Sequence, residues 1–171
     1  MSAAIKNITI GTASVSFGGS DLGALKAGSV DVNYDIEHIV LGNYEQLTGP
    51  AAVYRKLVQC ICKVHCLETQ LANIKTALGD SASVGGSNPA TLAIEYGEGM
   101  MTPAALVITG QAPRTTAGVA QARTITGANA VPFSKSVKFN MGNTEPAGVD
   151  IEFLILRNES GNDIAYSDVN A

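Results

Sequence analysis

Apolar and polar residues alternate along two segments near the start of the chain. Residues 13–17 alternate serine with apolar side chains, and residues 28–36 alternate two valines and a tyrosine with polar neighbours. A period of two is typical of strands with one buried face. Because the intervening Gly-Gly-Ser-Asp at 18–21 predicts a turn, we expect the two strands to pair as a hairpin.

A longer strand and a helix are predicted in the middle of the chain. Residues 53–67 carry apolar side chains on both faces of an extended strand, so we expect this strand to lie centrally in a sheet. Four apolar residues then recur at helical spacing: Leu67, Leu71, Ile74 and Leu78. This spacing predicts a helix over 69–78, with Glu68 and Thr69 as capping residues and Gly79 as its end.

The rest of the chain has the rhythm of short strands. Strands are predicted near 91–96, 103–110, 119–126, 134–141 and 149–157, separated by Gly, Pro and Asn. Residues 80–90 are predicted as a loop of small residues, and residues 158–171 as a polar C-terminal tail, either mobile or an arm ordered by a neighbour. Together these elements predict a mainly β fold, an antiparallel β-sandwich or half-barrel with one packed α-helix, in a single domain spanning 1–171.

Composition favours a chain that associates with itself. Charged residues make up 15% of the sequence, below the roughly 25% of typical domains, and the mean hydropathy is +0.17. No apolar stretch is long enough for a membrane helix, and the first residues lack the pattern of a signal peptide. Apolar surface is hidden most simply by self-association, although a monomer with a plain surface is the alternative. A net charge of −4 and the absence of Trp disfavour tight nucleic-acid binding.

Two sequence stretches resemble those of a known family. Residues 17–37 read FGGSDLGALKAGSVDVNYDIE, and residues 66–79 read CLETQLANIKTALG. Both are similar to segments of the tail tube proteins of long-tailed bacteriophages. The first resembles a Gly-rich turn between two strands of that family, and the second resembles an acidic helix that follows a long strand. The resemblance implies a structural virion protein that forms stacked hexameric rings, the conduit for genome ejection, assembled in the host cytoplasm.

The same resemblance implies partners. They are other copies of the chain, a tape-measure protein, tail terminator and baseplate proteins, and a sheath if the tail contracts. DNA would pass through the lumen without specific binding, and the role needs no cofactor, metal, membrane or catalytic step. A ring protein of a type VI secretion system is the nearest alternative, because it has a similar fold and ring. A monomeric β-sandwich that binds carbohydrate is the alternative from another class.

Two surfaces are candidates for assembly. The alternation at 30–37 places Asp31, Asn33, Asp35 and Glu37 on one face. The resemblance implies that this acidic face lines the lumen, and the plain alternative is a solvated sheet face. Residues 37–50 are predicted as a long loop or an extended hairpin arm. By the resemblance it is an inter-subunit, inter-ring contact through four apolar residues: Ile39, Leu41, Tyr44 and Leu47.

The cysteines and histidines raise the question of a chemical site. On a strand, His65 points away from Cys60, Cys62 and Cys66, and this run lacks the turn that a tetrahedral zinc site needs. The three cysteines are therefore candidates either for buried thiols or for a disulfide, including one between subunits. Neither His38 nor His65 lies in a catalytic motif, so we predict no enzymatic function.

Overall fold

Among the described residues, the fold is mainly antiparallel β with one α-helix, which confirms the predicted fold class. The computed structural model describes residues 13–26, 29–41, 52–67, 70–79, 82–87, 89–95, 99–112, 121–137 and 148–170. The strands are β1 Ser14–Phe17, β2 Ser20–Asp21, β3 Asp31–Leu41, β4 Ala52–Cys66, β5 Ala82–Gly85, β6 Thr91–Ile94, β7 Ala104–Ala112, β8 Gln121–Pro132, β9 Val149–Ile155 and β10 Ile164–Asn170, and the helix is α1 Leu71–Leu78.

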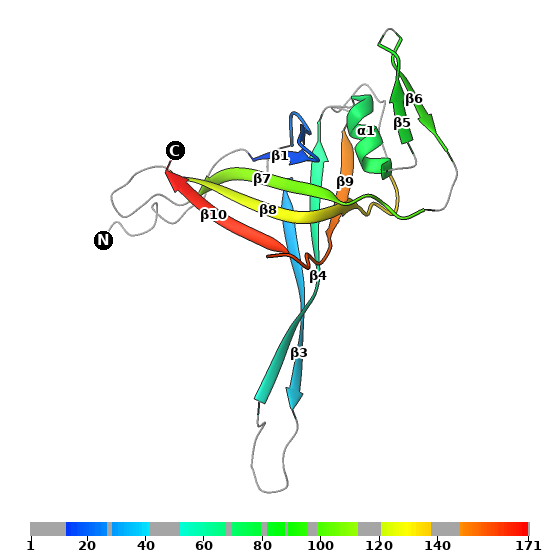
Figure 1. The fold of residues 1–171 in the computed structure, drawn as a ribbon. Helices are drawn as coiled ribbons and strands as arrows, with labels where there is room; N and C mark the ends of the chain where they lie inside the picture. Colours follow the sequence, from blue (N-terminus) through cyan, green and yellow to red (C-terminus); the bar gives the residue numbers. More distant parts are fainter. Residues whose placement is uncertain are drawn as a thin grey trace, which may run out of the picture.

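In the described part of the chain, eight strands form one sheet, in the order β2-β1-β7-β8-β9-β4-β3, with β10 beside β8. Strands β5 and β6 form a separate hairpin. In Figure 1, β7, β8 and β10 run across the direction of β3, β4 and β9, so the sheet is strongly bent. Strand β4 pairs with β3 on one side and β9 on the other, which confirms its predicted interior position.

The bend lies where β8 changes partner along one edge. This edge pairs with β10 over 121–127 and with β9 over 130–132. Between these pairings, residues 157–162 leave the edge and return to it, and Asn158 N donates to Asp163 Oδ1 at 2.5 Å across the excursion. Gly127 lies at this point, and a Cβ there would lie 2.9 Å from Ile155 Cδ1, so only glycine fits without movement.

The core lies between the two halves of the bent sheet. Phe17 of β1 and Phe153 of β9 pack with ring centroids 4.9 Å apart. The buried cluster draws on both halves and on the helix: Val15, Leu22, Cys62, Val64, Cys66, Ile74, Ala77, Leu106, Ile108, Ala130, Val149, Ile151 and Phe153. Burial of this apolar surface is the main stabilising contribution to the fold.

Helix α1 covers one end of the core. The helix begins two residues later than predicted. Its N-cap is Gln70, which makes no side-chain capping hydrogen bond. The predicted capping residues, Glu68 and Thr69, lie outside the described residues. Gly79 ends the helix with a φ of 71°, which confirms the predicted C-terminus, since a positive φ suits glycine. The buried Asn73 fastens the helix by donating from Nδ2 to the carbonyl of Leu22 at 3.0 Å.

The predicted N-terminal hairpin is wrong in its pairing. Strand β1 pairs with β2 and β7, whereas β3 pairs with β4. The reason is local, because Gly18 and Gly19, both with positive φ, reverse the chain at once into the two-residue β2. The chain then crosses to the other half of the sheet, where Leu25 forms a bridge to Cys66.

Three other predictions differ from the structure. The predicted loop at 80–90 contains β5, which pairs with β6. The predicted polar tail contains β10, whose seven residues pair with β8 of the same chain. Of the strand predicted at 134–141, residues 134–137 are not extended into a strand, because β8 ends at Pro132, and the remainder lies outside the described residues.

Candidate assembly surfaces

The predicted acidic face is exposed on β3. Asp31, Asn33, Asp35 and Glu37 are all exposed, and alternating Val32 and Tyr34 are partly buried. Residues directly opposite in an antiparallel pair share a face, so this face continues onto β4 and β9. The residues that share it there are Gln59, Ile61, Lys63 and His65 on β4 and Asp150, Glu152 and Leu154 on β9.

A charged row crosses three strands of this face. Lys63 lies opposite Asp31 on β3 and opposite Glu152 on β9, and its Nζ is 2.8 Å from Glu152 Oε1. The hydrogen bond that Lys63 donates to Glu152, and then the charge of Glu152, raise the pKa of Lys63, and the charge of Asp31 adds to this. One lysine between two carboxylates leaves the row negative. The sequence did not reveal Glu152 as part of this surface, because only strand pairing brings β9 beside β4.

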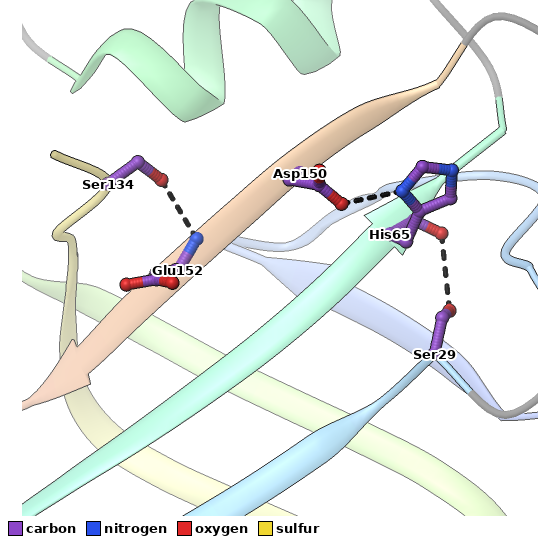
Figure 2. Close-up of polar contacts among 5 residues, drawn as sticks. All are labelled: Ser29, His65, Ser134, Asp150 and Glu152. Carbon is purple, nitrogen blue, oxygen red and sulfur yellow. Dashed lines mark hydrogen bonds and ion pairs between the residues drawn. The ribbon is translucent and has the colours of Figure 1, made fainter. Parts of the chain in front are cut away.

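His65 and Asp150 form the next row, shown in Figure 2. His65 Nδ1 and Asp150 Oδ1 lie 2.5 Å apart. Ser29 is close, but its hydroxyl donates to the backbone carbonyl of His65 at 3.3 Å, not to the imidazole. The three residues therefore lack the serine-to-imidazole hydrogen bond of a nucleophile and its base. Farther along β9, the backbone N–H of Glu152 donates to Ser134 Oγ at 2.9 Å.

The β3–β4 hairpin projects beyond the rest of the sheet (Figure 1). The register of β3 and β4 shifts between Asp35 and Ile36. Beyond the shift, the two strands pair only with each other among the described residues. We refer to 36–41 with 52–57 as the arm, and to the remainder of the described chain as the body. Both faces of the arm expose apolar side chains. Their exposed fractions are 40% for Ile36, 43% for Ile39, and 58% for both Val53 and Tyr54.

The arm includes part of the predicted inter-ring segment. Ile39 lies on β3 directly opposite Tyr54, and Leu41 is the last residue of β3. Tyr44 and Leu47 lie outside the described residues. The sequence left a long loop and an extended hairpin arm as alternatives for 37–50. The described part, 37–41, is a strand and belongs to a hairpin arm.

A groove lies where the arm meets the start of β10. It has a volume of about 500 Å³ and is lined by Tyr34, Ile36, Arg55, Gly161, Asn162, Asp163, Ile164 and Tyr166. The hydroxyl of Tyr34 is buried and has no hydrogen-bond partner among the described residues. Burial raises the pKa of Tyr166. We refer to this set as the groove; the sequence did not predict it, because its two walls are more than a hundred positions apart.

Among the described residues, one ion pair joins β10 to β8 in addition to the backbone hydrogen bonds. Arg123 Nε donates to Asp168 Oδ1 at 2.7 Å and its second guanidinium nitrogen to Oδ2 at 2.8 Å, a bidentate geometry. The hydrogen bond from Arg123 lowers the pKa of Asp168 and raises that of Arg123. Within the described chain, the other edge of β10 and the outer edge of β3 have no strand partner.

The three cysteines are buried, and none of them is part of a disulfide. Burial raises the pKa of Cys60, and it raises that of Cys62 to about 12, with smaller contributions from the charges of Cys60 and Asp31. All three thiols are shielded from solvent in the folded subunit, so no cysteine sulfur lies on its surface for a bond to a neighbour.

Two other kinds of site are absent from the part of the chain that the structure describes. In the described ranges, no group of three or more His, Cys, Asp or Glu side chains is placed to hold a metal ion. No helix in those ranges is long and apolar enough to cross a membrane.

The described residues form a mainly antiparallel β protein with sheet edges that lack a partner in this part of the chain, an acidic face and a projecting apolar arm. No protein-family model matches the chain, and no curated protein matches its sequence. Among solved structures, it is similar to a chain of the cryo-EM structure of an extracellular contractile injection system, the PVC sheath–tube complex in its extended state. The two chains are 15% identical, with a TM-score of 0.47, and the match covers 99% of each.

Proposed function

We propose that this protein is a structural tube subunit, which assembles into hexameric rings that stack into the tail tube of a bacteriophage. The tube would be the conduit for genome ejection, and the role has no chemical step. The resemblance of residues 17–37 and 66–79 to tail tube proteins supports this function, and so does the arrangement of surfaces on the subunit.

The arm is the observation that carries the proposal. A two-stranded hairpin is only marginally stable in water, because it has no core of its own. Here the arm exposes Ile36, Ile39, Val53 and Tyr54 on its two faces. Apolar side chains gathered on a projecting element mark a surface that another protein covers. The proposed cover is a neighbouring subunit, with Ile39, Leu41, Tyr44 and Leu47 in the contact between rings.

The free strand edges support closure of a ring. The outer edge of β3 and that of β10 present unpaired backbone groups within the described chain. Such edges invite pairing with another chain, and a closed ring removes them without leaving an end exposed to further growth. Assembly through edges and an arm would repeat several modest contacts by symmetry.

The acidic face is the proposed lining of the lumen. Asp31, Asn33, Asp35 and Glu37 would face the channel, where negative charge repels the phosphates of DNA and disfavours binding during passage. Reversal of Asp31 and Asp35 to lysine should leave the rings intact and slow DNA passage. Normal infectivity of such a phage would contradict the lumen assignment.

The proposed setting is a phage particle, with assembly in the host cytoplasm. The partners there are a tape-measure protein inside the tube, terminator and baseplate proteins at its ends, and a sheath around it if the tail contracts. A type VI secretion ring protein would share the subunit surfaces but not the passage of DNA. DNA release from particles carrying the subunit distinguishes the two.

Negative-stain electron microscopy with sedimentation tests the proposal directly. The purified chain is expected to form rings or hollow tubes, with and without reductant, because its thiols are buried. Strictly monomeric particles at high concentration would contradict the function and favour the alternative, a monomeric module that binds carbohydrate.

A further inference from the structure

The two apolar faces of the arm are different surfaces. Ile36 and Val53 lie on the face that continues into the groove, and we call this the inner face. Ile39 and Tyr54 lie on the opposite face, which continues into the acidic face, and we call this the outer face. A contact that buries the arm must therefore cover two surfaces that are not equivalent.

Symmetry limits how copies of one chain can do this. A two-fold contact joins a surface to the same surface of the partner, so it covers one face of each arm and leaves the other exposed. A head-to-tail contact places the outer face of one arm on the inner face of the next. One kind of contact, repeated around a ring, then covers both faces of every arm.

Each face of the arm carries a charge that forms no ion pair within the described residues. Arg55 is exposed on the inner face, directly opposite His38, and lines the groove. Glu37 is exposed on the outer face, directly opposite Lys56. Among the described residues, neither Arg55 nor Glu37 forms an ion pair. Glu37 has Lys56 beside it but forms no ion pair with it, so Arg55 of a second copy can supply one.

The two charges also lie at nearly the same height along the arm. Glu37 pairs with Lys56, and the adjacent pair is His38 with Arg55. Residues one position apart along a strand differ in height by about 3.3 Å. Two parallel arms can therefore join Glu37 to Arg55 with almost no displacement along the arm axis. That geometry fits neighbours in one ring, not subunits in successive rings.

We propose that the groove and the inner face of each arm bind the outer face of the arm of the neighbouring subunit in the same ring. Arg55 pairs with Glu37 of the neighbour, and Ile36 and Val53 pack against the neighbour's Ile39 and Tyr54. The inference rests on the proposed function and deepens it, because it names the surfaces that close the ring.

The inference changes two assignments in the proposed tube. Glu37 leaves the lumen-facing set, which keeps Asp31, Asn33 and Asp35. Ile39 contacts the neighbour within the ring, and the contact between rings is left to Leu41, Tyr44 and Leu47.

A charge exchange between Glu37 and Arg55 tests the contact. Glu37→Arg and Arg55→Glu should each raise the subunit concentration needed for half-maximal ring formation by at least about tenfold. The double variant should bring it back to within about threefold of the unchanged chain, since it restores the pair in the opposite sense. Sedimentation velocity measures the ring fraction, and negative-stain images identify the species.

Matched controls separate this contact from general charge effects. Glu95→Arg and Lys26→Glu make the same changes in net charge at exposed positions outside the groove and the arm, and they should assemble like the unchanged chain. Circular-dichroism melting of each dissociated variant checks that the fold is kept. Rings that form normally with both single variants overturn this inference and leave the proposed function standing. An unchanged chain that stays monomeric at high concentration overturns both.

Discussion

The two ends of strand β4 lie in opposite environments. Cys60, Cys62 and Cys66, near its C-terminal end, are buried in the core, whereas Val53 and Tyr54 near its start are 58% exposed. Cys60 and Cys62 pair with β3, as Val53 and Tyr54 do, so pairing with β3 does not distinguish the two ends. The C-terminal end also pairs with β9 and faces the core. The body is therefore stabilised by its own packing, while the apolar side chains of the arm remain available for contacts between subunits.

The largest effect on subunit stability is expected in the body. Phe153→Ala removes a fully buried ring that packs against Phe17, and it should lower the free energy of unfolding by about 3–5 kcal/mol. Urea denaturation of the dissociated subunit measures this. The matched control is Phe133→Ala, at a phenylalanine that is 41% exposed, and it should cost about 1 kcal/mol or less. Equal losses would show that burial does not distinguish the two sites.

A second effect on the body depends on pH. Burial raises the pKa of the Cys62 thiol from 9.0 to about 12. In the unfolded chain the thiol ionises near 9.0, so its contribution to stability is complete below that pH and is lost as the pH rises toward 12. The free energy of unfolding should therefore fall above about pH 9. The free energy of unfolding of Cys62→Ala should fall less steeply with pH over the same range. An identical slope would show that ionisation of Cys62 does not cause the pH dependence.

Much of the body could be predicted from the sequence, because its signals are local. The alternation at 60–66 and the spacing of Leu71, Ile74 and Leu78 depend on residues close together in the chain, and they gave the central strand and the helix. The pairing of β1 could not be predicted in this way. Its partner β7 is about ninety positions away, and a hairpin with the next strand is the simpler expectation from local pattern.

The surfaces were predictable only in part, for the same reason. The alternation around Asp31, Asn33 and Asp35 revealed the acidic residues of β3, but Glu152 joins them only through pairing between β4 and β9. The groove needs the start of β10 beside Tyr34 and Arg55. Residues 158–171 are polar, and β10 is ordered by backbone pairing and by Arg123, neither of which leaves a hydrophobic pattern.

A smaller and local effect is expected at β10, which belongs to the body but buries little. Asp168→Asn removes the carboxylate that accepts two hydrogen bonds from Arg123. Amide hydrogens of β10 should then exchange several-fold faster, while those of β9 are unchanged. The lowered pKa of Asp168 means that the pair stabilises β10 above its usual pKa of 3.8 and is lost as the pH falls below this value. Ser167→Ala on the same strand is the control, and equal acceleration there would exclude the ion pair as the cause.

The smallest effect on subunit stability is expected in the arm, and it makes the comparison with the body sharpest. Ile39→Ser and Tyr54→Ser remove exposed side chains that face each other across β3 and β4. Each should change the free energy of unfolding of the dissociated subunit by about 1 kcal/mol or less, because only a cross-strand contact at the surface is lost. Ring formation should nevertheless be strongly weakened, as measured by sedimentation under the same conditions. Thr91→Ser, an exposed change away from the arm, should affect neither quantity.

If the arm variants destabilised the subunit as strongly as Phe153→Ala, the arm would be part of the folded core. If these variants assembled normally, the apolar faces of the arm would not be the contact between subunits. Loss of assembly with little loss of stability is the one result that assigns folding to the body and association to the arm.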